Sequence, residues 1–214
     1  MGDAPHEVHL TPAEALILNS LIGRPLDRVS AEDRQAPYVS ASVYSESREI
    51  ILAIEEVFTP TPEIPGAHIH RPKVYEGPVA MYQLHSPSRE NLLATELRIL
   101  GESLGTITQI LVLTTAVSFD GPHAVGPVQV LDDVVLPEGT AWGPVLTHPN
   151  EGARPTPPVA MADLGILIKT DSGHTAIFNT EGIGFIHLWV TVDGPVAGAL
   201  AGVVEEISIS ERLR

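Results

Sequence analysis

The sequence contains no cysteine, which excludes disulfide bonds, thiolate metal ligands and thiol nucleophiles. Aromatic residues make up only 5% of the chain and are scattered along it. Because sugars and single-stranded nucleic acids are held by several aromatic rings placed together, no such stacking surface is expected. The sequence also lacks a P-loop, a G-x-G-x-x-G loop and an H-E-x-x-H signature, so no nucleotide or zinc-protease motif indicates an activity.

Basic residues are scarce as well. Twelve Lys and Arg residues stand against 27 Asp and Glu residues, which gives a formal net charge of −15. Proteins bind phosphate backbones and anionic membrane surfaces through several cationic side chains, so neither a nucleic acid nor a membrane is expected as a partner. An acidic surface favours solubility, and it also suits a cationic partner or metal ions.

Long apolar runs are missing too. No stretch approaches the length of a membrane span, and the N-terminal stretch MGDAPHEVHLTPAEA has no basic segment followed by an apolar one, as a secretory signal would. We therefore expect a soluble, cytoplasmic protein.

Proline and glycine, in contrast, are frequent, with 19 and 18 residues. They reverse the chain often, which favours short strands over long helices. With 214 residues, of which 43% are hydrophobic, the chain is long enough to bury a core. We predict a mainly β protein, an antiparallel β-sandwich or a barrel-like fold.

One short helix is expected near the N-terminus, after a flexible tail over residues 1–10. Thr11 is a good N-cap, Pro12 fits the first helical position, and Glu14 completes a capping box. The apolar face predicted for this helix consists of Ala13, Leu16, Ile17, Ser20 and Leu21.

Most of the remaining chain has the composition and the two-residue alternation of strands. Strands are expected in residues 38–58 (a hairpin that reverses at SESR), 106–119 (one strand that must bend), 163–192 (two or three strands with a reversal at TDSG) and 201–210. The stretch 88–100 fits a second short helix, and it fits a strand over 93–100 equally well.

Residues 137–159 are rich in proline and glycine and predict a long loop. This loop divides a β-rich domain over 11–214 into two parts, about 11–136 and 160–214. The two parts are either similar lobes or sections of one continuous structure.

A gapless match between residues 119–136 and 192–209 supports the first of these alternatives. Asp-Gly-Pro begins at Asp120 in one window and at Asp193 in the other, and both windows end in an apolar segment with an acid pair. The other explanation is that Asp-Gly-Pro turns are common and that strands resemble one another.

Three pairs of adjacent acids occur in segments expected to be strands. Successive side chains of a strand point to opposite faces, so one pair cannot direct two carboxylates at one point. We interpret the pairs as solvated charge that protects sheet edges. They are Glu55–Glu56, Asp132–Asp133 and Glu205–Glu206.

The sharpest candidate for a chemical site is GAHIHRPKVYEG, residues 66–77. His68 and His70 are two residues apart, a spacing that places both on one face of a strand. Two imidazoles there can share a Zn, Fe, Ni or Cu ion, and Glu76 is the nearby carboxylate to complete the set.

This pattern resembles the first motif of cupin barrels, in which His-x-His is followed by a Glu and a glycine. Glu76 lies further along than in that motif. Cupins supply another His after a Pro-x-Gly turn, whereas after Pro137-Glu138-Gly139 this chain has Trp142 at the corresponding position. The resemblance implies a metal-dependent enzyme, an isomerase, cyclase or oxygenase, acting on a small molecule inside a β-barrel.

Two classes of function therefore stay open. The first, which we favour, is a non-catalytic binding or protein-interaction protein, either a monomer or a homo-oligomer, whose partner is a protein or a small molecule. The second is the cupin-like enzyme with a divalent metal at His68, His70 and Glu76. No catalytic residue is identified for either class.

Overall fold

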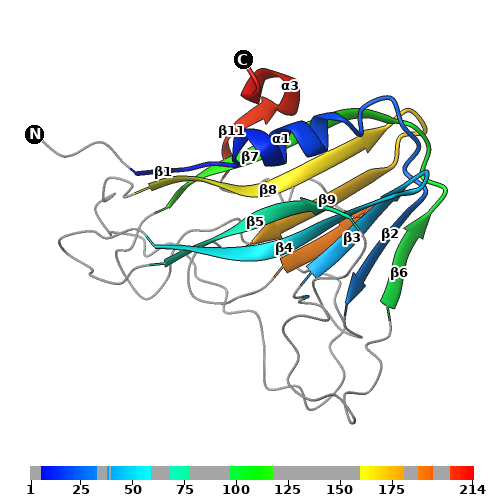
Figure 1. Cartoon of the computed structure of the whole chain (residues 1–214), viewed down its shortest axis with the longest axis horizontal. Coiled ribbons are helices and arrows are strands. Elements are labelled where there is room, and N and C mark those ends of the chain that lie inside the picture. Colours follow the sequence, from blue (N-terminus) through cyan, green and yellow to red (C-terminus); the bar gives the residue numbers. More distant parts are fainter. Residues whose placement is uncertain are drawn as a thin grey trace, which may run out of the picture.

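The computed structural model describes residues 6–32, 38, 40–58, 68–77, 97–117, 160–180, 188–194 and 203–214 (Figure 1). In chain order its elements are β1 (His6–Val8), α1 (Pro12–Asn19), β2 (Arg28–Glu32), β3 (Ser40–Ser45), β4 (Arg48–Phe58), β5 (His68–Glu76), β6 (Leu97–Glu102), β7 (Ile107–Val117), β8 (Ala160–Thr170), β9 (Thr175–Thr180), β10 (Leu188–Val192), β11 (Val203–Ser208) and α3 (Ile209–Arg212). Strands dominate, which confirms the prediction of a mainly β protein.

The strands form two sheets, stacked one above the other in Figure 1. The first has the order β10-β9-β8-β7-β11, with β1 beside β8, and the second has the order β5-β4-β3-β2-β6. Only β1 and β8 are parallel; the other strand pairs of the described residues are antiparallel. Because the two ladders stay separate over these residues, the fold is a sandwich and not a closed barrel. None of the described helices is long and apolar enough to cross a membrane.

The main core lies between the two sheets. Val43 and Leu52 of the second sheet are fully buried in one cluster with Ile110, Ile166 and Phe178 of the first. Burying a side chain of this size is worth roughly 1.5–3 kcal/mol relative to leaving it exposed. This packing therefore holds the layers together.

Helix α1 begins as the sequence predicts. Thr11 is the N-cap, Pro12 opens the helix, and both hydrogen bonds of the capping box with Glu14 are present. These residues satisfy backbone N–H groups that the first turn of a helix leaves unpaired.

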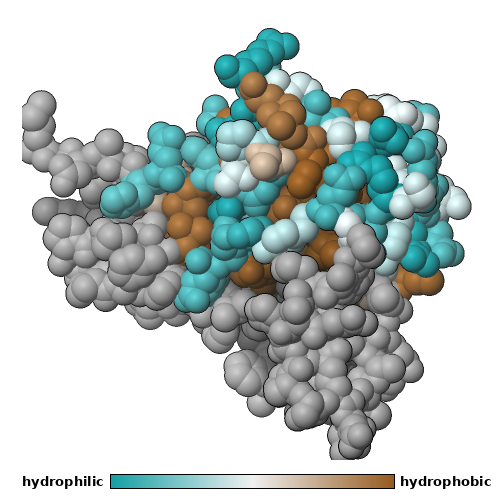
Figure 2. Space-filling model, viewed as in Figure 1, coloured by the Kyte–Doolittle hydropathy of each residue, from teal (hydrophilic) through white to brown (hydrophobic). Residues whose placement is uncertain are grey.

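The predicted apolar face of α1 is correct only in part, because Leu21 is buried in the main core and Ile17 packs against it, but Ala13 and Leu16 are exposed. The buried residues of the helix are Glu14, Ala15 and Leu18, whereas Leu16 is 59% exposed. On the face seen in Figure 2, hydrophobic residues gather where α1 and α3 lie. The helix is rotated because the Glu14 carboxylate, and not an apolar side chain, faces β5.

Residues 6–10, which the sequence assigns to a flexible tail, are held in the fold. His6 to Val8 pair with Ala160 to Ala162 of β8, and Val8 and Leu10 are each only 6% exposed. The apolar Val8 and Leu10 give this segment enough burial to be ordered.

The helical alternative for 88–100 is wrong at its end. Leu97–Glu102 form the edge strand β6, which pairs with β2, and residues 88–96 lie outside the described residues. The strand alternative is therefore correct for residues 97–100, where pairing with β2 forms the strand, and the helix over 88–96 stays a prediction. A further helix among the described residues is α3, at the C-terminus.

The other expected strands are present. Strands β3 and β4 form the predicted hairpin, with Glu46 at a positive φ of 56° in its turn. Strand β7 spans eleven residues, and its register against β8 shifts between Leu113 and Thr114. At this shift the extra residue is Leu164 of β8, and a second shift, between Ile107 and Gln109, leaves Thr108 of β7 as the extra residue. The bend expected for this segment stays a prediction.

The two halves of the chain share one sheet, because β7 pairs with β8 along most of its length. The loop over 137–159 lies outside the described residues, and so does most of the repeat 119–136 and 192–209. The internal duplication stays a prediction.

The acid pairs have different surroundings. Glu205 and Glu206 are exposed on β11, an edge strand, as expected for charge that protects an edge. Asp132–Asp133 lie outside the described residues. Glu55 and Glu56 of β4 point in opposite directions and belong to the site described below.

Two glycines with positive φ allow a test of how tightly the turns pack. A Cβ on Gly105 (φ 95°) would lie 2.3 Å from Ser172 Oγ, whereas a Cβ on Gly173 (φ 84°) would meet no atom within 4 Å. Both alanine variants carry backbone strain of about 1 kcal/mol. We expect Gly105→Ala to lower the free energy of unfolding in urea by about 1–2 kcal/mol more than Gly173→Ala, because only the first meets a clash. Equal losses of unfolding free energy in the two variants would show that Ser172 moves away from the added Cβ at no cost.

Candidate functional site

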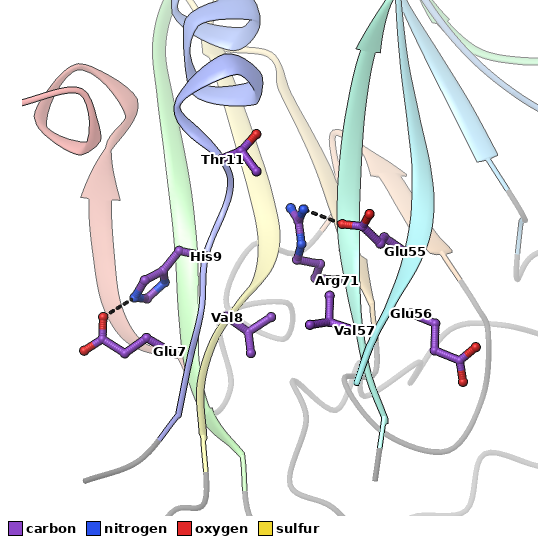
Figure 3. Close-up of a pocket in the computed structure, with 8 residues that line it drawn as sticks. All are labelled: Glu7, Val8, His9, Thr11, Glu55, Glu56, Val57 and Arg71. Atoms are coloured by element: carbon purple, nitrogen blue, oxygen red, sulfur yellow. Dashed lines mark hydrogen bonds and ion pairs between the residues drawn. The ribbon is translucent and has the colours of Figure 1, made fainter. Parts of the chain in front are cut away.

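An open depression of about 480 Å³ lies between β1 and the β4–β5 pair (Figure 3). We call it the groove. Its lining residues are Glu7, Val8, His9, Thr11, Glu55, Glu56, Val57 and Arg71.

The Glu14 carboxylate links the two walls of the groove near Thr11, because it contacts Thr11 at the start of α1 and Arg71 and Val74 of β5. It accepts hydrogen bonds from the Thr11 backbone N–H and hydroxyl (both 2.7 Å), from the Val74 N–H (3.1 Å) and from Arg71 Nη1 (3.0 Å). Glu14 and Arg71 are each 4% exposed. This buried ion pair therefore ties α1 to β5, and its remaining polar contacts offset the cost of removing both charges from water.

Arg71 is neutralised on two sides. Its Nη2 contacts Glu55, its Nη1 also donates to the Pro72 carbonyl (3.2 Å), and Lys73 bonds to the second oxygen of Glu55. The guanidinium is thus already occupied by carboxylates and a carbonyl, so it is not poised to bind an external anion.

The same contacts cover the outer edge of β5. In an antiparallel pair, alternate residues turn their N–H and C=O groups away from the partner strand. The outward groups of β5 include the His70 carbonyl, which accepts from Thr180 Oγ1 (2.5 Å), and the Val74 N–H, which donates to Glu14. Pro72 stands between them, where a missing N–H costs nothing. This edge is therefore closed to further strand pairing at these positions.

Hydrogen bonding lowers the pKa of Glu14 below its ordinary value of 4.5. Burial is the largest single influence and raises the pKa, but the hydrogen bonds from Thr11 and Val74 and the charge of Arg71 together outweigh it. The carboxylate is therefore ionised at neutral pH.

A second polar cluster lies on the other side of β1. The Asp163 carboxylate, 1% exposed and next to the bulge of β8, accepts from the Leu10 N–H (2.8 Å), Thr114 Oγ1 (2.7 Å) and Arg212 Nη2 (2.5 Å). Arg212 belongs to α3, so this cluster fastens the C-terminal helix to the N-terminal strand.

His9 connects Arg212 of this cluster with Glu7 of β1. Its Nδ1 is 2.8 Å from Arg212 Nη2, and its Nε2 is 2.9 Å from Glu7. Nδ1 also lies 3.1 Å from Asp163 Oδ1, so both ring nitrogens have polar partners within the protein. No ring nitrogen is left to act as a base toward the groove.

The groove has an apolar centre and acidic rims. In Figure 3, Val8 and Val57 face each other across it, Glu7 points away on one side and Glu56 on the other. The Glu7 and Glu56 side chains are 70% and 51% exposed. Thr11, the one hydroxyl residue among the eight lining residues, donates to Glu14 and is not free to react. The groove surface is thus apolar at its centre and acidic at its rims.

His70 and Glu76 of the predicted metal site lie far apart in the structure. His70 and Glu76 are six residues apart on one strand, a span of about 20 Å, and Glu76 is bound to Arg48 (2.6 Å). The side chain of His68 lies outside the described side chains. The structure does not bring Glu76 to His70, and binding of a metal by His68 and His70, like the cupin-like enzyme, stays a prediction.

Sequence reasoning missed two features. Residues 101–105 read Gly-Glu-Ser-Leu-Gly, the G-x-S-x-G spacing of a nucleophile elbow, and Ser103 has a positive φ of 55°. However, Ser103 joins two strands instead of a strand and a helix, and it makes no hydrogen bond to a histidine among the described residues. The second missed feature is the Glu14–Arg71 pair, which capping-box spacing alone does not reveal.

No protein family, curated protein or solved structure matches the chain.

Removing the charge of Glu14 tests its role in joining α1 to β5. We expect Glu14→Gln to lower the free energy of unfolding in urea by about 2–4 kcal/mol, because Arg71 loses a buried partner. The matched control is Glu46→Gln, which breaks an exposed ion pair with Arg24 (2.7 Å) and should cost less than about 1 kcal/mol. Similar losses in both variants would contradict a special role for Glu14.

The same pair predicts how stability depends on pH. A carboxyl whose folded-state pKa is lowered contributes stability above its ordinary pKa of 4.5, and this contribution is lost as the pH falls through the lowered value. The difference between wild type and Glu14→Gln should therefore be full at pH 7 and shrink steadily below pH 4.5. Urea unfolding of both proteins at several pH values measures it, and a constant difference would show that Glu14 does not titrate as described.

Proposed function

We propose that the chain is a non-catalytic binding protein, and that the groove receives a segment of a protein partner in which an apolar side chain is flanked by basic ones. The observation that supports this proposal is the arrangement of side chains on the groove surface. An apolar centre formed by Val8 and Val57 lies between two exposed carboxylates, Glu7 and Glu56.

The charges of the region favour a basic partner. Arg71 and Lys73 are already paired with Glu14 and Glu55. Glu7 and Glu56 therefore dominate the exposed charge beside the groove, and the whole chain carries a net charge of −15. A field of this sign speeds encounters with cationic segments and repels acidic ones.

The apolar centre supports a side-chain contact in addition to charge. A leucine-sized side chain can bury part of its surface on Val8 and Val57, and the aliphatic stems of neighbouring lysines can follow the walls. The occupied state of Arg71 and His9 supports binding over catalysis, because neither offers a free group for acid–base chemistry. The expected cytoplasmic location and the alternative of a homo-oligomer stay predictions.

Peptide titration followed by NMR tests the proposal. We expect the Val8 and Val57 methyl signals to shift with acetyl-Lys-Lys-Leu-Lys-Lys-amide, and to respond weakly when the peptide has Ser in place of Leu or Glu in place of Lys. Glu7→Gln combined with Glu56→Gln should weaken binding by about tenfold, since two exposed charge pairs are worth about 1–2 kcal/mol together.

A second double variant separates local from overall charge. Glu46→Gln with Glu205→Gln removes the same charge from exposed residues outside the groove and should leave binding nearly unchanged. Equal weakening in both double variants, or shifts that miss Val8 and Val57, would refute the groove as the binding site.

A further inference from the structure

The imidazole of His70 is buried without a hydrogen bond. His70 is 5% exposed, and neither Nδ1 nor Nε2 has a hydrogen-bond partner. Buried polar groups are nearly always bonded, and an unsatisfied one costs about 1–3 kcal/mol. A ring with two unsatisfied nitrogens is therefore a strong candidate for a ligand-binding group.

The backbone of His70 is held firmly, in contrast to its ring. Its carbonyl accepts from Thr180 Oγ1 of β9 (2.5 Å), and its strand position is paired with Glu56 of β4. Strands β4 and β9 thus hold the backbone position from which the His70 side chain extends. A ligand-binding side chain on a rigid strand loses little freedom when it binds.

Glu56 supplies a carboxylate beside this ring. Its Oε1 is 3.9 Å from His70 Nε2, too long for a hydrogen bond. Two ligand atoms on a tetrahedral zinc ion, with bonds of 2.0–2.2 Å, lie about 3.4 Å apart. To share such an ion, the Glu56 oxygen and the His70 nitrogen must approach each other by about 0.5 Å from their 3.9 Å separation.

We propose that His70 and Glu56 bind a divalent transition-metal ion such as Zn²⁺. Imidazole nitrogen and carboxylate oxygen are ligands that such ions prefer, and neither residue leaves its strand to form the site. The exposed side of Glu56 gives the ion a path from solvent and leaves its other coordination positions to water. Within the described residues no third His, Asp or Glu joins the two, so the site is an open one.

This ligand set differs from the one expected from the sequence. His70 is retained, but its carboxylate is Glu56, directly opposite on the neighbouring strand, and not Glu76 on the same strand. The site shares Glu56 with the rim of the proposed groove, although this side chain points away from the Val8–Val57 centre (Figure 3). The Zn²⁺ titration is carried out without peptide, so its outcome is separate from that of the peptide experiment.

Calorimetric titration of metal-free protein with ZnCl₂ tests the site. We expect Glu56→Gln to weaken Zn²⁺ binding by about tenfold or more, because it removes one of two protein ligands. The thermal midpoint of the wild type should rise with Zn²⁺, and this rise should be largely lost in the variant. Glu56 is half-exposed, so the variant should fold, which its thermal midpoint without metal verifies.

Glu76→Gln is the matched control, because it removes the same charge from the other end of β5 and should leave Zn²⁺ affinity within about twofold. NMR of the His70 ring nitrogens gives an independent readout, with a large shift expected at one nitrogen on addition of Zn²⁺. Equal Zn²⁺ affinity in wild type and Glu56→Gln, or an unchanged His70 ring, would overturn the proposal.

Discussion

The buried carboxylate of Glu14 is the constraint on which the arrangement of this sandwich depends. One side chain completes the cap of α1, pairs with Arg71 and accepts the outward N–H of Val74. An edge strand with unpaired backbone groups invites pairing with another chain, and here a helix terminus and a proline close that edge instead. Because ionised groups are expensive to bury, this arrangement is stable only with all of its partners present.

Fixing β5 in this way creates both surfaces on which function is proposed. On one side of the β4–β5 pair, Arg71 and Glu55 are drawn toward α1, and the groove opens beside Val57 and Val8. The cross-strand neighbour of His70 is Glu56, which points the other way. Glu55 is therefore bound to Arg71 and Lys73, whereas Glu56 lies beside His70 at the exposed rim of the groove, because successive side chains of a strand leave it on opposite faces. That alternation is also why the pair could not form an acid–base dyad.

Local signals were reliable where a single segment decides its own structure. The Thr11 cap and the hairpin of β3 and β4 follow from capping and turn chemistry. The buried face of α1 was predicted only in part, because it includes the charged residue Glu14. A pattern based on hydrophobic residues does not identify a charged residue that is buried with a partner. The tail was mispredicted at residues 6–10 because pairing with β8, more than 150 residues later, orders it.

By itself the sequence determined the fold class, the start of the helix and the acidic net charge, and it indicated His70 as a candidate metal ligand. It contains the residues of the groove and of the His70–Glu56 pair but not their proximity. Glu56 lies opposite His70, and Glu76 lies far from it, only because of the register between β4 and β5. Register is a long-range property, since a slip of one residue would turn every side chain to the other face. For this physical reason the tertiary structure alone decided which carboxylate meets the histidine and which valines meet across the groove.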